Sequence, residues 1–238
     1  MNLTALLSVG VQALSRNRLR SALTVLGIVI GVAAVIATLA IGQGARAAVQ
    51  EQIRSLGANI LQVMPGTVTA GGARSGMGSI TTMTPDDALA IKRECPAVEM
   101  VAPTVRTLGQ VVAGANNWNT QVQGTTADYA SIRAWTIDKG VFITDSDVRG
   151  AAKVAVLGAN VAQQLFGDAD AVGQTIRIKE IPFRVVGVLT YKGGQTFGGS
   201  QDDVVLVPLT TAQRKLMGIT YVNSILCSAV SEGQWPRP

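Results

Sequence analysis

The sequence contains no histidine and only two cysteines, and these shortages exclude much catalytic and metal-binding chemistry. Without histidine there is no Ser–His or Cys–His nucleophile pair and no histidine general base, and most kinds of zinc site are excluded too. The two cysteines, Cys95 and Cys227, lie far apart in the sequence and belong to no paired ligand motif. They are either free buried thiols or a single disulfide, because the sequence alone does not place their Cα atoms.

Charged and aromatic residues are scarce as well. Charged residues make up 15% of the 238 residues and aromatic residues 4%, whereas about a quarter of a soluble domain is charged. The net charge of +5 divides unevenly: Arg16, Arg18 and Arg20 give the first 20 residues +3, and the remaining 17 basic and 15 acidic residues give +2. A nucleic-acid-binding domain would show a basic stripe with interleaved aromatic residues. We therefore expect no nucleic-acid partner.

The apolar residues are concentrated in one run of 25 uncharged residues between Arg20 and Arg46. A helix needs about 20 apolar residues to cross the hydrocarbon core of a bilayer, whereas strands usually run about 3–10 residues. The apolar core of a cleavable signal peptide is shorter, at about 7–15 residues. We interpret residues 21–42 as a transmembrane helix that acts as an uncleaved signal anchor. A signal peptide cleaved near residues 45–47 is the alternative.

The arginines before this run predict its orientation. Because Arg16, Arg18 and Arg20 all precede the span, the positive-inside rule places residues 1–20 in the cytoplasm and the bulk of the chain outside. Apolar residues at helical spacing within residues 1–20 predict an amphipathic helix at the cytoplasmic membrane surface.

Small and polar residues within the span predict specific contacts. Gly27 and Gly31 form a G-x-x-x-G pattern, which lets a second helix approach closely, so we predict transmembrane helix packing at these two residues. Thr24 and Thr38 are expected to hydrogen-bond back to the helix backbone. Beyond the span, residues 43–57 continue in good helix formers up to a terminating glycine and predict a stalk helix outside the membrane.

The remainder of the chain predicts a mixed α/β body of short elements. Strands are expected at residues 58–63, 99–106, 109–113, 120–124, 154–157, 174–179, 182–189, 204–207 and 221–230. A tight Glu180-Ile181 connection is expected between two of these strands. Helices are expected from Pro85, with Thr84 as the N-cap, from residues 158 to 165, and from a cap at Thr210 to Gly218.

The motifs that could carry chemistry also have structural explanations. The Gly-rich residues 67–79 lack the Lys-Ser/Thr of a phosphate-binding loop, and residues 154–160 lack the later glycines of a dinucleotide-binding turn. The acidic pairs are expected to serve turns and caps, because a calcium loop needs more oxygen ligands; these pairs are Asp145/Asp147, Asp168/Asp170 and Asp202/Asp203. No nucleophile, base and oxyanion site come together. We expect no enzyme activity and no catalytic, cofactor-binding or metal-binding residues on this chain.

Several motifs together resemble one known family. The chain resembles the MacB-type ABC transporter permeases of the FtsX-like group in RNRLRSALTVLGIVIGVAAVIATLAIGQGA, SLGANILQVMPG, AWTIDKGVFITDSDV, KVAVLGANVAQQLFG, VGQTIRI, PFRVVGVLTYKG and DDVVLVPLTTAQRKLMG. These motifs follow the order of the family and cover essentially the whole chain.

The resemblance implies an α+β fold class. One N-terminal transmembrane helix with a stalk would be followed by a mixed α/β porter-like periplasmic domain, interrupted by a mostly β subdomain. The implied division is a first porter-like part at residues 58–127, the inserted β-rich subdomain at residues 128–197 and a second porter-like part at residues 198–230.

The resemblance also implies a function and partners. The chain would be the N-terminal segment of a bacterial inner-membrane permease, working as a homodimer or paired permease. Such a permease couples ATP hydrolysis by an ABC ATPase subunit, which carries the ATP and Mg, to periplasmic expulsion of a drug, peptide or other amphiphile. The coupling is mechanotransmission through the stalk helices. A periplasmic adaptor and an outer-membrane duct are further implied partners.

Three departures limit what is carried over from the family. Residues 231–238 do not resemble the stalk helix of the family, so we expect a truncated tail of a shortened permease or a fragment. No Walker A sequence precedes the permease, so the ATPase is expected on a separate polypeptide. Lys139-Gly140 stands where family members often carry Gly-Arg, so a functional arginine is not carried over.

Three other functions stay open as alternatives. An FtsX-type transmembrane signalling subunit would activate a cell-wall hydrolase without transporting anything, and a lipoprotein-releasing permease would extract lipid-anchored proteins. A membrane-anchored enzyme is disfavoured by the lack of histidine.

Overall fold

The computed structural model describes residues 18–55, 60–66, 69–70, 73–74, 81–193, 195–196 and 199–229. The chain divides into two compact units, Met1–Gln52 and Ile53–Pro238, and we call the second the globular unit. The part of the predicted amphipathic helix before Arg18, and the predicted tail at residues 231–238, lie outside the described residues.

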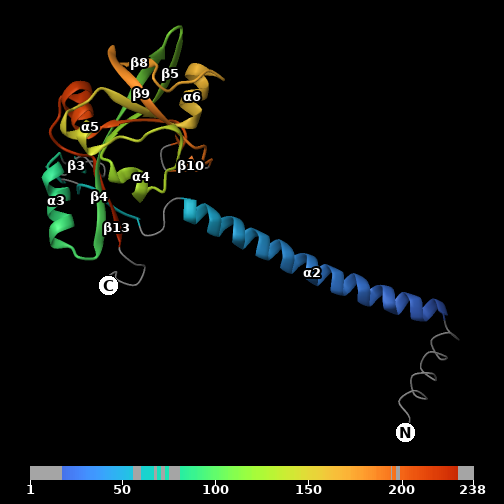
Figure 1. Ribbon diagram of the computed structural model, residues 1–238. Helices are drawn as coiled ribbons and strands as arrows, with labels where there is room; N and C mark the ends of the chain where they lie inside the picture. The colour runs from blue at the N-terminus through green and yellow to red at the C-terminus, as the bar shows by residue number, and fades with distance from the viewer. Residues whose placement is uncertain are drawn as a thin grey trace. The chain divides into compact units, whose positions relative to one another are not determined.

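All described residues of the first unit lie in one long helix, α2, which spans Arg18–Ser55 and so ends three residues into the second unit (Figure 1). Its 38 residues extend about 57 Å at 1.5 Å per residue. The predicted transmembrane segment and most of the predicted stalk therefore form one continuous helix. The hydroxyls of Thr24 and Thr38 donate to the backbone carbonyls four residues earlier, at 2.8 and 2.9 Å, as the sequence predicted.

The globular unit is an α+β fold, as predicted, built around one large sheet. Its strands are β1 (Ile60–Val63), β4 (Val98–Ala113), β5 (Asn116–Thr125), β6 (Ile137–Gly140), β7 (Val154–Leu157), β8 (Thr175–Ile178), β9 (Ile181–Leu189), β12 (Val204–Pro208) and β13 (Ser224–Ala229). Two small hairpins lie outside this sheet, one of β2 (Thr69–Ala70) with β3 (Ala73–Arg74) and one of β10 (Gln195–Thr196) with β11 (Gly199–Ser200).

The large sheet closes on itself. Its strands follow the order β1-β13-β4-β5-β12-β7-β9-β6, and β8 pairs with both β4 and β9. Strand β8 therefore completes a ring of β4, β5, β12, β7, β9 and β8, with Val111 of β4 opposite Ile178 of β8. The predicted insert at residues 128–197 supplies β7, β8 and β9; of these, β7 pairs with β12 of the second predicted porter-like part and β8 with β4 of the first. The division into subdomains stays a prediction.

The six strands of the ring share one buried core. Each contributes fully buried apolar side chains to it, among them Val105, Val122, Leu157, Ile176, Phe183 and Val205. A second core lies where α4 (Asp128–Ile132) and Trp135 pack with Val156 of β7 and Leu206 of β12. Because adjacent residues of a strand point to opposite faces, β7 and β12 contribute to both cores.

Strand β4 corrects the sequence prediction of two separate strands. It runs unbroken for 16 residues and changes partner along its length. Residues 98–104 pair with β13 and residues 105–113 with β5. The pairing with β5 continues through Thr107 and Leu108, which separate the two predicted strands, although Leu108 is 72% exposed. The strand predicted at residues 120–124 also begins earlier, because β5 starts at Asn116, directly after a two-residue turn that follows β4.

The connection between β8 and β9 lies one residue earlier than predicted. Ile178 pairs with Ile181, so the turn consists of Lys179 and Glu180, which have φ angles of +47° and +68°. Positive φ at both central residues is the backbone of a type I′ hairpin, whose twist matches that of the strands. The sequence did not indicate this turn, because the two central positions of a type I′ turn usually carry Asn or Gly and here carry Lys179 and Glu180.

The predicted helix caps are confirmed for α3 (Pro85–Glu94), where the Thr84 N–H donates to the Asp87 carboxylate at 2.7 Å. The same arrangement begins α5 (Asp145–Arg149), where the Thr144 N–H donates to Asp147 at 2.9 Å. In both helices the acidic residue of the first turn satisfies a backbone donor that the helix leaves unpaired. Helix α6 (Ala159–Phe166) ends at Gly167, as predicted.

The helix after β12 corrects the role predicted for Thr210. The chain forms α7 (Leu209–Thr211) and continues into the π-helical η1 (Ala212–Met217), which ends at Gly218 as predicted. Thr210 lies inside α7, and its hydroxyl donates to the Val148 carbonyl of α5 instead of capping the helix. The hydroxyl thus donates to a carbonyl of another helix, whereas as an N-cap it would have accepted a backbone N–H of its own helix.

Candidate functional site

The residues predicted to orient and pack the membrane helix lie on α2. Arg18 and Arg20 are in its first turn, and Arg16 lies outside the described residues. Gly27 and Gly31 have no other group within 4 Å of where a side chain would begin, so the small-residue face is open in this structure. Their role in helix packing stays a prediction.

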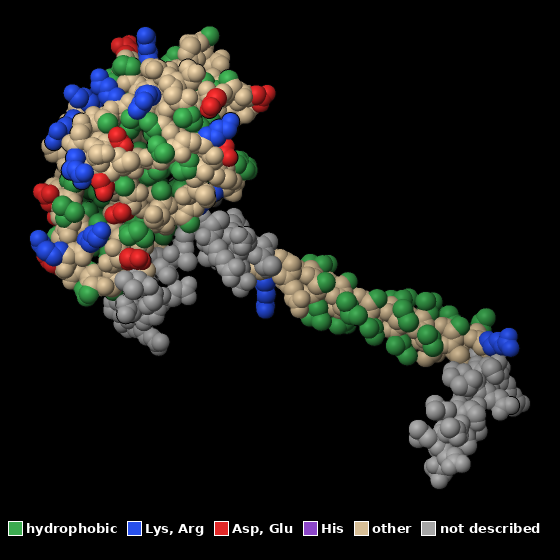
Figure 2. All heavy atoms as spheres, in the orientation of Figure 1, with side chains coloured by type: hydrophobic (Ala, Val, Ile, Leu, Met, Phe, Trp, Pro, Cys, Tyr) green, Lys and Arg blue, Asp and Glu red, His purple; other side chains and the backbone are tan. Residues whose placement is uncertain are grey.

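Helix α2 exposes apolar side chains on every side. Along Arg18–Arg46 the helix is long and apolar enough to cross a membrane, and none of its apolar window is buried. Figure 2 shows hydrophobic side chains along the visible face of this stretch, between basic side chains at its two ends. A helix that is apolar all round belongs in a protein core or a bilayer. Since no core surrounds it, this segment is suited to a membrane.

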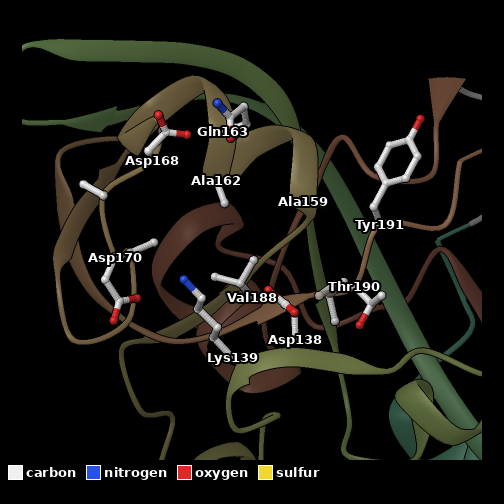
Figure 3. Close-up of a pocket in the computed structure, with 14 residues that line it drawn as sticks. Asp138, Lys139, Ala159, Ala162, Gln163, Asp168, Asp170, Val188, Thr190 and Tyr191 are labelled. Carbon is white, nitrogen blue, oxygen red and sulfur yellow. The ribbon is translucent and has the colours of Figure 1, made fainter.

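The globular unit carries a hollow of about 500 Å³ on a different set of elements. One wall is α6, a second is the loop at residues 167–171, and a third is β6 together with the residues that end β9 (Figure 3). The floor is apolar and includes Ala162, Val188 and Leu189. A concave surface of this size is in the range of small-molecule sites.

Ionisable side chains surround this floor. Asp138 and Lys139 come from β6, and Asp168 and Asp170 come from the loop after α6. Figure 3 shows Lys139 projecting into the hollow toward Ala162 and Val188. Three carboxylates and one ammonium give the lining a formal charge of −2.

The buried carboxylate of Asp202 holds two walls of the hollow in place. Asp202 is fully buried, and its two carboxylate oxygens accept the backbone N–H groups of Lys192 at 2.9 Å and Gly193 at 2.8 Å. Its backbone carbonyl accepts the N–H of Asn160, at the start of α6. One residue therefore fixes both the helix wall and the chain that follows β9.

Lys192 strengthens the same attachment. Its ammonium donates to the Arg133 carbonyl at 2.7 Å and lies 4.7 Å from the centre of the Trp135 ring. Burial lowers the pKa of Lys192 below its usual value, and the nearby Arg133 charge lowers it further, while Asp202 opposes both effects. The chain after β9, including Tyr191 at the rim, is thus tied to the second core.

The backbone conformation explains why glycine follows Lys139. Gly140 has a φ of +81°, and a Cβ there would lie 2.1 Å from the Val186 carbonyl oxygen. A Cβ on Gly187 would likewise lie 2.4 Å from the Val141 carbonyl oxygen. Only glycine allows the two strands to approach this closely, and this approach sets the position of Lys139 beside the hollow.

Both cysteines are free thiols, so the disulfide alternative does not apply. Cys95 is exposed at the end of α3, and Cys227 is buried in β13. Burial raises the pKa of the Cys227 thiol. The exposed Cys95 is therefore the accessible one of the two.

One acidic pair, Asp202/Asp203, has wider roles than the turns and caps the sequence predicted. Asp170 does serve a turn by accepting the Val172 N–H at 3.1 Å. Asp203, however, accepts from the Trp118 indole and the Thr120 hydroxyl across strands. Asp202 was not predicted as the organising residue of a hollow. Its position two residues before the apolar run of β12 is the one sequence signal for its burial.

Comparison with known proteins identifies the family of this arrangement. Residues 21–233 match the family model of the MacB-like periplasmic core domain. The macrolide export ATP-binding/permease protein MacB of Syntrophobacter fumaroxidans is 45% identical over 91% of this chain and 30% of its own length. The same-named protein of Chlorobaculum tepidum is 43% identical over 90% of this chain and 33% of its own length. The chain thus spans about a third of the length of these relatives.

Solved structures share the fold. The periplasmic region of MacB from Actinobacillus actinomycetemcomitans superposes with a TM-score of 0.63 at 22% identity, covering 76% of this chain and 78% of that one. The extracellular domain of the ABC-type transporter YknZ from Gram-positive bacteria superposes with a TM-score of 0.59 at 16% identity, covering 74% of this chain and 86% of that one. The family match, these relatives and the shared fold agree, and the chain belongs to the MacB-like periplasmic core domain family of ABC transporter permeases.

Proposed function

We propose that this chain is the N-terminal segment of an exporter permease, which transmits ATP-driven movement from the cytoplasm to the globular unit. In this role α2 spans the bacterial inner membrane, and the globular unit lies in the periplasm. The exported molecule is a drug, a peptide or another amphiphile. Macrolides are the first class to test, because the relatives are named for their export.

The observation that carries the proposal is the continuity of α2. The hydrocarbon core of a bilayer is about 30 Å thick, so 38 residues of helix exceed it by about 25 Å. The apolar stretch ends near Arg46, and the helix continues to Ser55. An unbroken helix can carry a displacement of one end to the other, whereas a flexible linker cannot.

The partners follow from the same proposal. An ABC ATPase, with bound ATP and Mg, drives the cytoplasmic end. A second permease chain packs against α2 at Gly27 and Gly31, where the absence of side chains allows close approach. A periplasmic adaptor and an outer-membrane duct receive the exported molecule.

A helix break tests the proposal in the assembled transporter that contains this chain. Ala48→Pro removes a backbone donor in the part of α2 beyond the apolar stretch, at a cost of about 3 kcal/mol to the helix. We expect export of a labelled macrolide to fall at least about tenfold, while ATP hydrolysis continues. The matched control Ala48→Gln keeps a good helix former and should export normally.

The alternatives give different outcomes in the same assay. Unchanged export in Ala48→Pro would contradict transmission through α2. If the intact transporter exports nothing but cell-wall hydrolysis falls in Ala48→Pro, the chain is a signalling subunit of the FtsX type. If lipoproteins are retained in the membrane by the same variant, it is a lipoprotein-releasing permease.

A further inference from the structure

The charged residues of the globular unit are divided between two regions. Residues 81–229 contain 13 basic and 13 acidic residues and so have no net formal charge. Three segments, residues 145–153, 175–189 and 209–217, contain seven of the basic residues but only three of the acidic ones. These segments therefore carry a formal charge of +4, and the remainder carries −4.

Hydrogen bonds join the three segments on one side of the ring. The Thr211 hydroxyl of α7 donates to the Ala152 carbonyl at 2.8 Å. The Arg184 N–H of β9 donates to the Lys153 carbonyl at 2.9 Å. Figure 2 shows Lys and Arg side chains gathered over the part of the globular unit where Figure 1 labels α5. The excess of positive charge is thus concentrated on one surface.

Six of the seven basic side chains in these segments are exposed and have no partner within the described part of the chain, in either a hydrogen bond or an ion pair. We call these six residues the basic face: Arg149, Lys153, Arg177, Arg184, Arg214 and Lys215. One of the three acidic residues, Asp147, is already engaged in the cap of α5. Like charges held together repel one another, so the basic face is suited to an anionic partner.

Two arginines of the basic face have a spacing that fits an extended peptide. Arg177 pairs with Pro182 across β8 and β9, so Arg184 lies two residues further along the partner strand and points to the same outer face. Side chains related in this way are about 7–8 Å apart, and alternate side chains of an extended chain are about 6.6 Å apart. Carboxylates at alternate positions can therefore reach both arginines, and each guanidinium can hold a carboxylate through two N–H groups.

The helix that carries Arg214 and Lys215 has a rare backbone. It is the π-helical η1, and π-helical turns are uncommon and occur frequently at functional sites. The buried Gln213 amide donates to the backbone carbonyls of residues 220–221 at 3.2 and 2.9 Å, and the Lys179 ammonium donates to a carbonyl of η1 at 3.3 Å. Because these bonds fix η1 in advance, less conformational entropy is lost when a partner binds.

The surroundings of the basic face favour a polypeptide over a lipid surface. A surface that binds membranes combines basic with apolar side chains. In the described globular unit the exposed large apolar side chains lie outside the three segments, at Leu61, Met64, Leu89, Leu108, Val141 and Tyr191. None of the six basic residues lines the hollow either. A chain of carboxylates can contact several of the six cations at once, which a single small anion cannot.

We propose that the basic face is a docking surface for an acidic segment of a partner protein. The segment lies extended across β8 and β9, with alternate carboxylates at Arg177 and Arg184, and its remaining carboxylates pair with the neighbouring cations of the face. The inference goes beyond the proposed function, because it identifies a partner by its charge and does not depend on export.

Docking is tested with the whole chain in nanodiscs of zwitterionic lipid, with empty nanodiscs subtracted. The probe is a fluorescent deca-glutamate peptide, and an uncharged Gly-Ser peptide of the same length is the comparison. Fluorescence anisotropy should show saturable binding of deca-glutamate and none of the Gly-Ser peptide. The binding should weaken as salt is added, because salt screens exposed charges.

Two double variants separate the basic face from the net charge of the chain. Arg184→Gln with Arg214→Gln removes two cations from the face and should weaken deca-glutamate binding about two- to tenfold. Arg93→Gln with Lys139→Gln removes two exposed cations outside the face and should change binding less than about twofold. Both double variants lower the net charge equally and replace only exposed side chains.

Equal weakening by the two double variants would overturn the proposal, as would a lack of deca-glutamate binding. Capture of the nanodiscs by phosphatidylglycerol liposomes, without binding of the peptide, would overturn it in favour of an anionic lipid surface. The assay needs neither ATP nor transport. A failure of the proposed export function would therefore appear in the Ala48→Pro experiment, and a failure of this docking surface would appear only here.

Discussion

Helix α2 and the globular unit use similar apolar residues in opposite surroundings. Leu23 and Ile30 of α2 are 63% and 60% exposed, whereas Leu157 and Ile178 of the ring are fully buried. Burying an apolar side chain of this size is worth about 1.5–3 kcal/mol. The globular unit gains this energy from its own two cores. Helix α2 gains it only from a bilayer or from another helix within the bilayer.

The comparison also separates two kinds of specificity. In the globular unit each apolar side chain has fixed neighbours, so its shape matters. In a bilayer the surrounding hydrocarbon adapts, so apolar character and helix length matter more than shape. Substitutions that change shape or charge should therefore have different effects in the two regions.

A change of shape should have its largest effect in the ring. Phe183→Ala empties part of the ring core and should lower the free energy of unfolding by about 3–5 kcal/mol. Leu26→Ala, on α2, should leave that free energy unchanged, because Leu26 is 54% exposed and Phe183 is fully buried. Thermal unfolding of the chain in nanodiscs measures both. Equal losses in the two variants would remove the distinction between the regions.

A change of charge, by contrast, should have its larger effect in α2. Val32, at 53% exposure, lies near the middle of the uncharged run, and Leu108, at 72%, lies on β4. Val32→Lys should make membrane insertion about 2.5–3.5 kcal/mol less favourable. Leu108→Lys should change stability by less than about 0.5 kcal/mol. Glycosylation-reporter insertion assays and thermal unfolding measure the two effects, and normal insertion of Val32→Lys would argue against a span.

A smaller effect is expected where a buried polar group organises the globular unit. Asp202→Asn keeps the shape but presents an amide to the backbone donors of Lys192 and Gly193 in place of a full carboxylate. Leaving buried donors poorly satisfied should cost about 1–3 kcal/mol. Asp203→Asn, which keeps the neighbouring position, should retain the Asp202 contacts. Hydrogen exchange of the Lys192 and Gly193 amides reports the change, and unaltered protection in Asp202→Asn would contradict the assigned role.

The features that the sequence predicted correctly depend on near neighbours. The length of α2, the back-bonding of Thr24 and Thr38, and the Thr84–Asp87 cap all involve residues within four positions of each other. The pattern of apolar residues also predicted most strands, and the family resemblance implied the α+β class.

The features that the sequence did not predict depend on distant partners. Closure of the ring rests on Val111 opposite Ile178, and the hollow rests on Asp202 contacting both Lys192 and the start of α6. Thr210 took an acceptor from α5 that no local pattern indicates. None of these contacts between distant residues produces a periodic pattern in a single sequence. The hollow therefore could not be predicted from the sequence.

Thiol labelling tests most directly the claim that α2 spans the membrane and holds the globular unit on its outer side. Cys95 is exposed and Cys227 is buried, so the natural chain carries its own reporter. A membrane-impermeant maleimide, added to intact cells with a permeabilised outer membrane, should label the chain, and Cys95→Ser should abolish the labelling. Labelling that occurs only after the inner membrane is lysed would contradict the account.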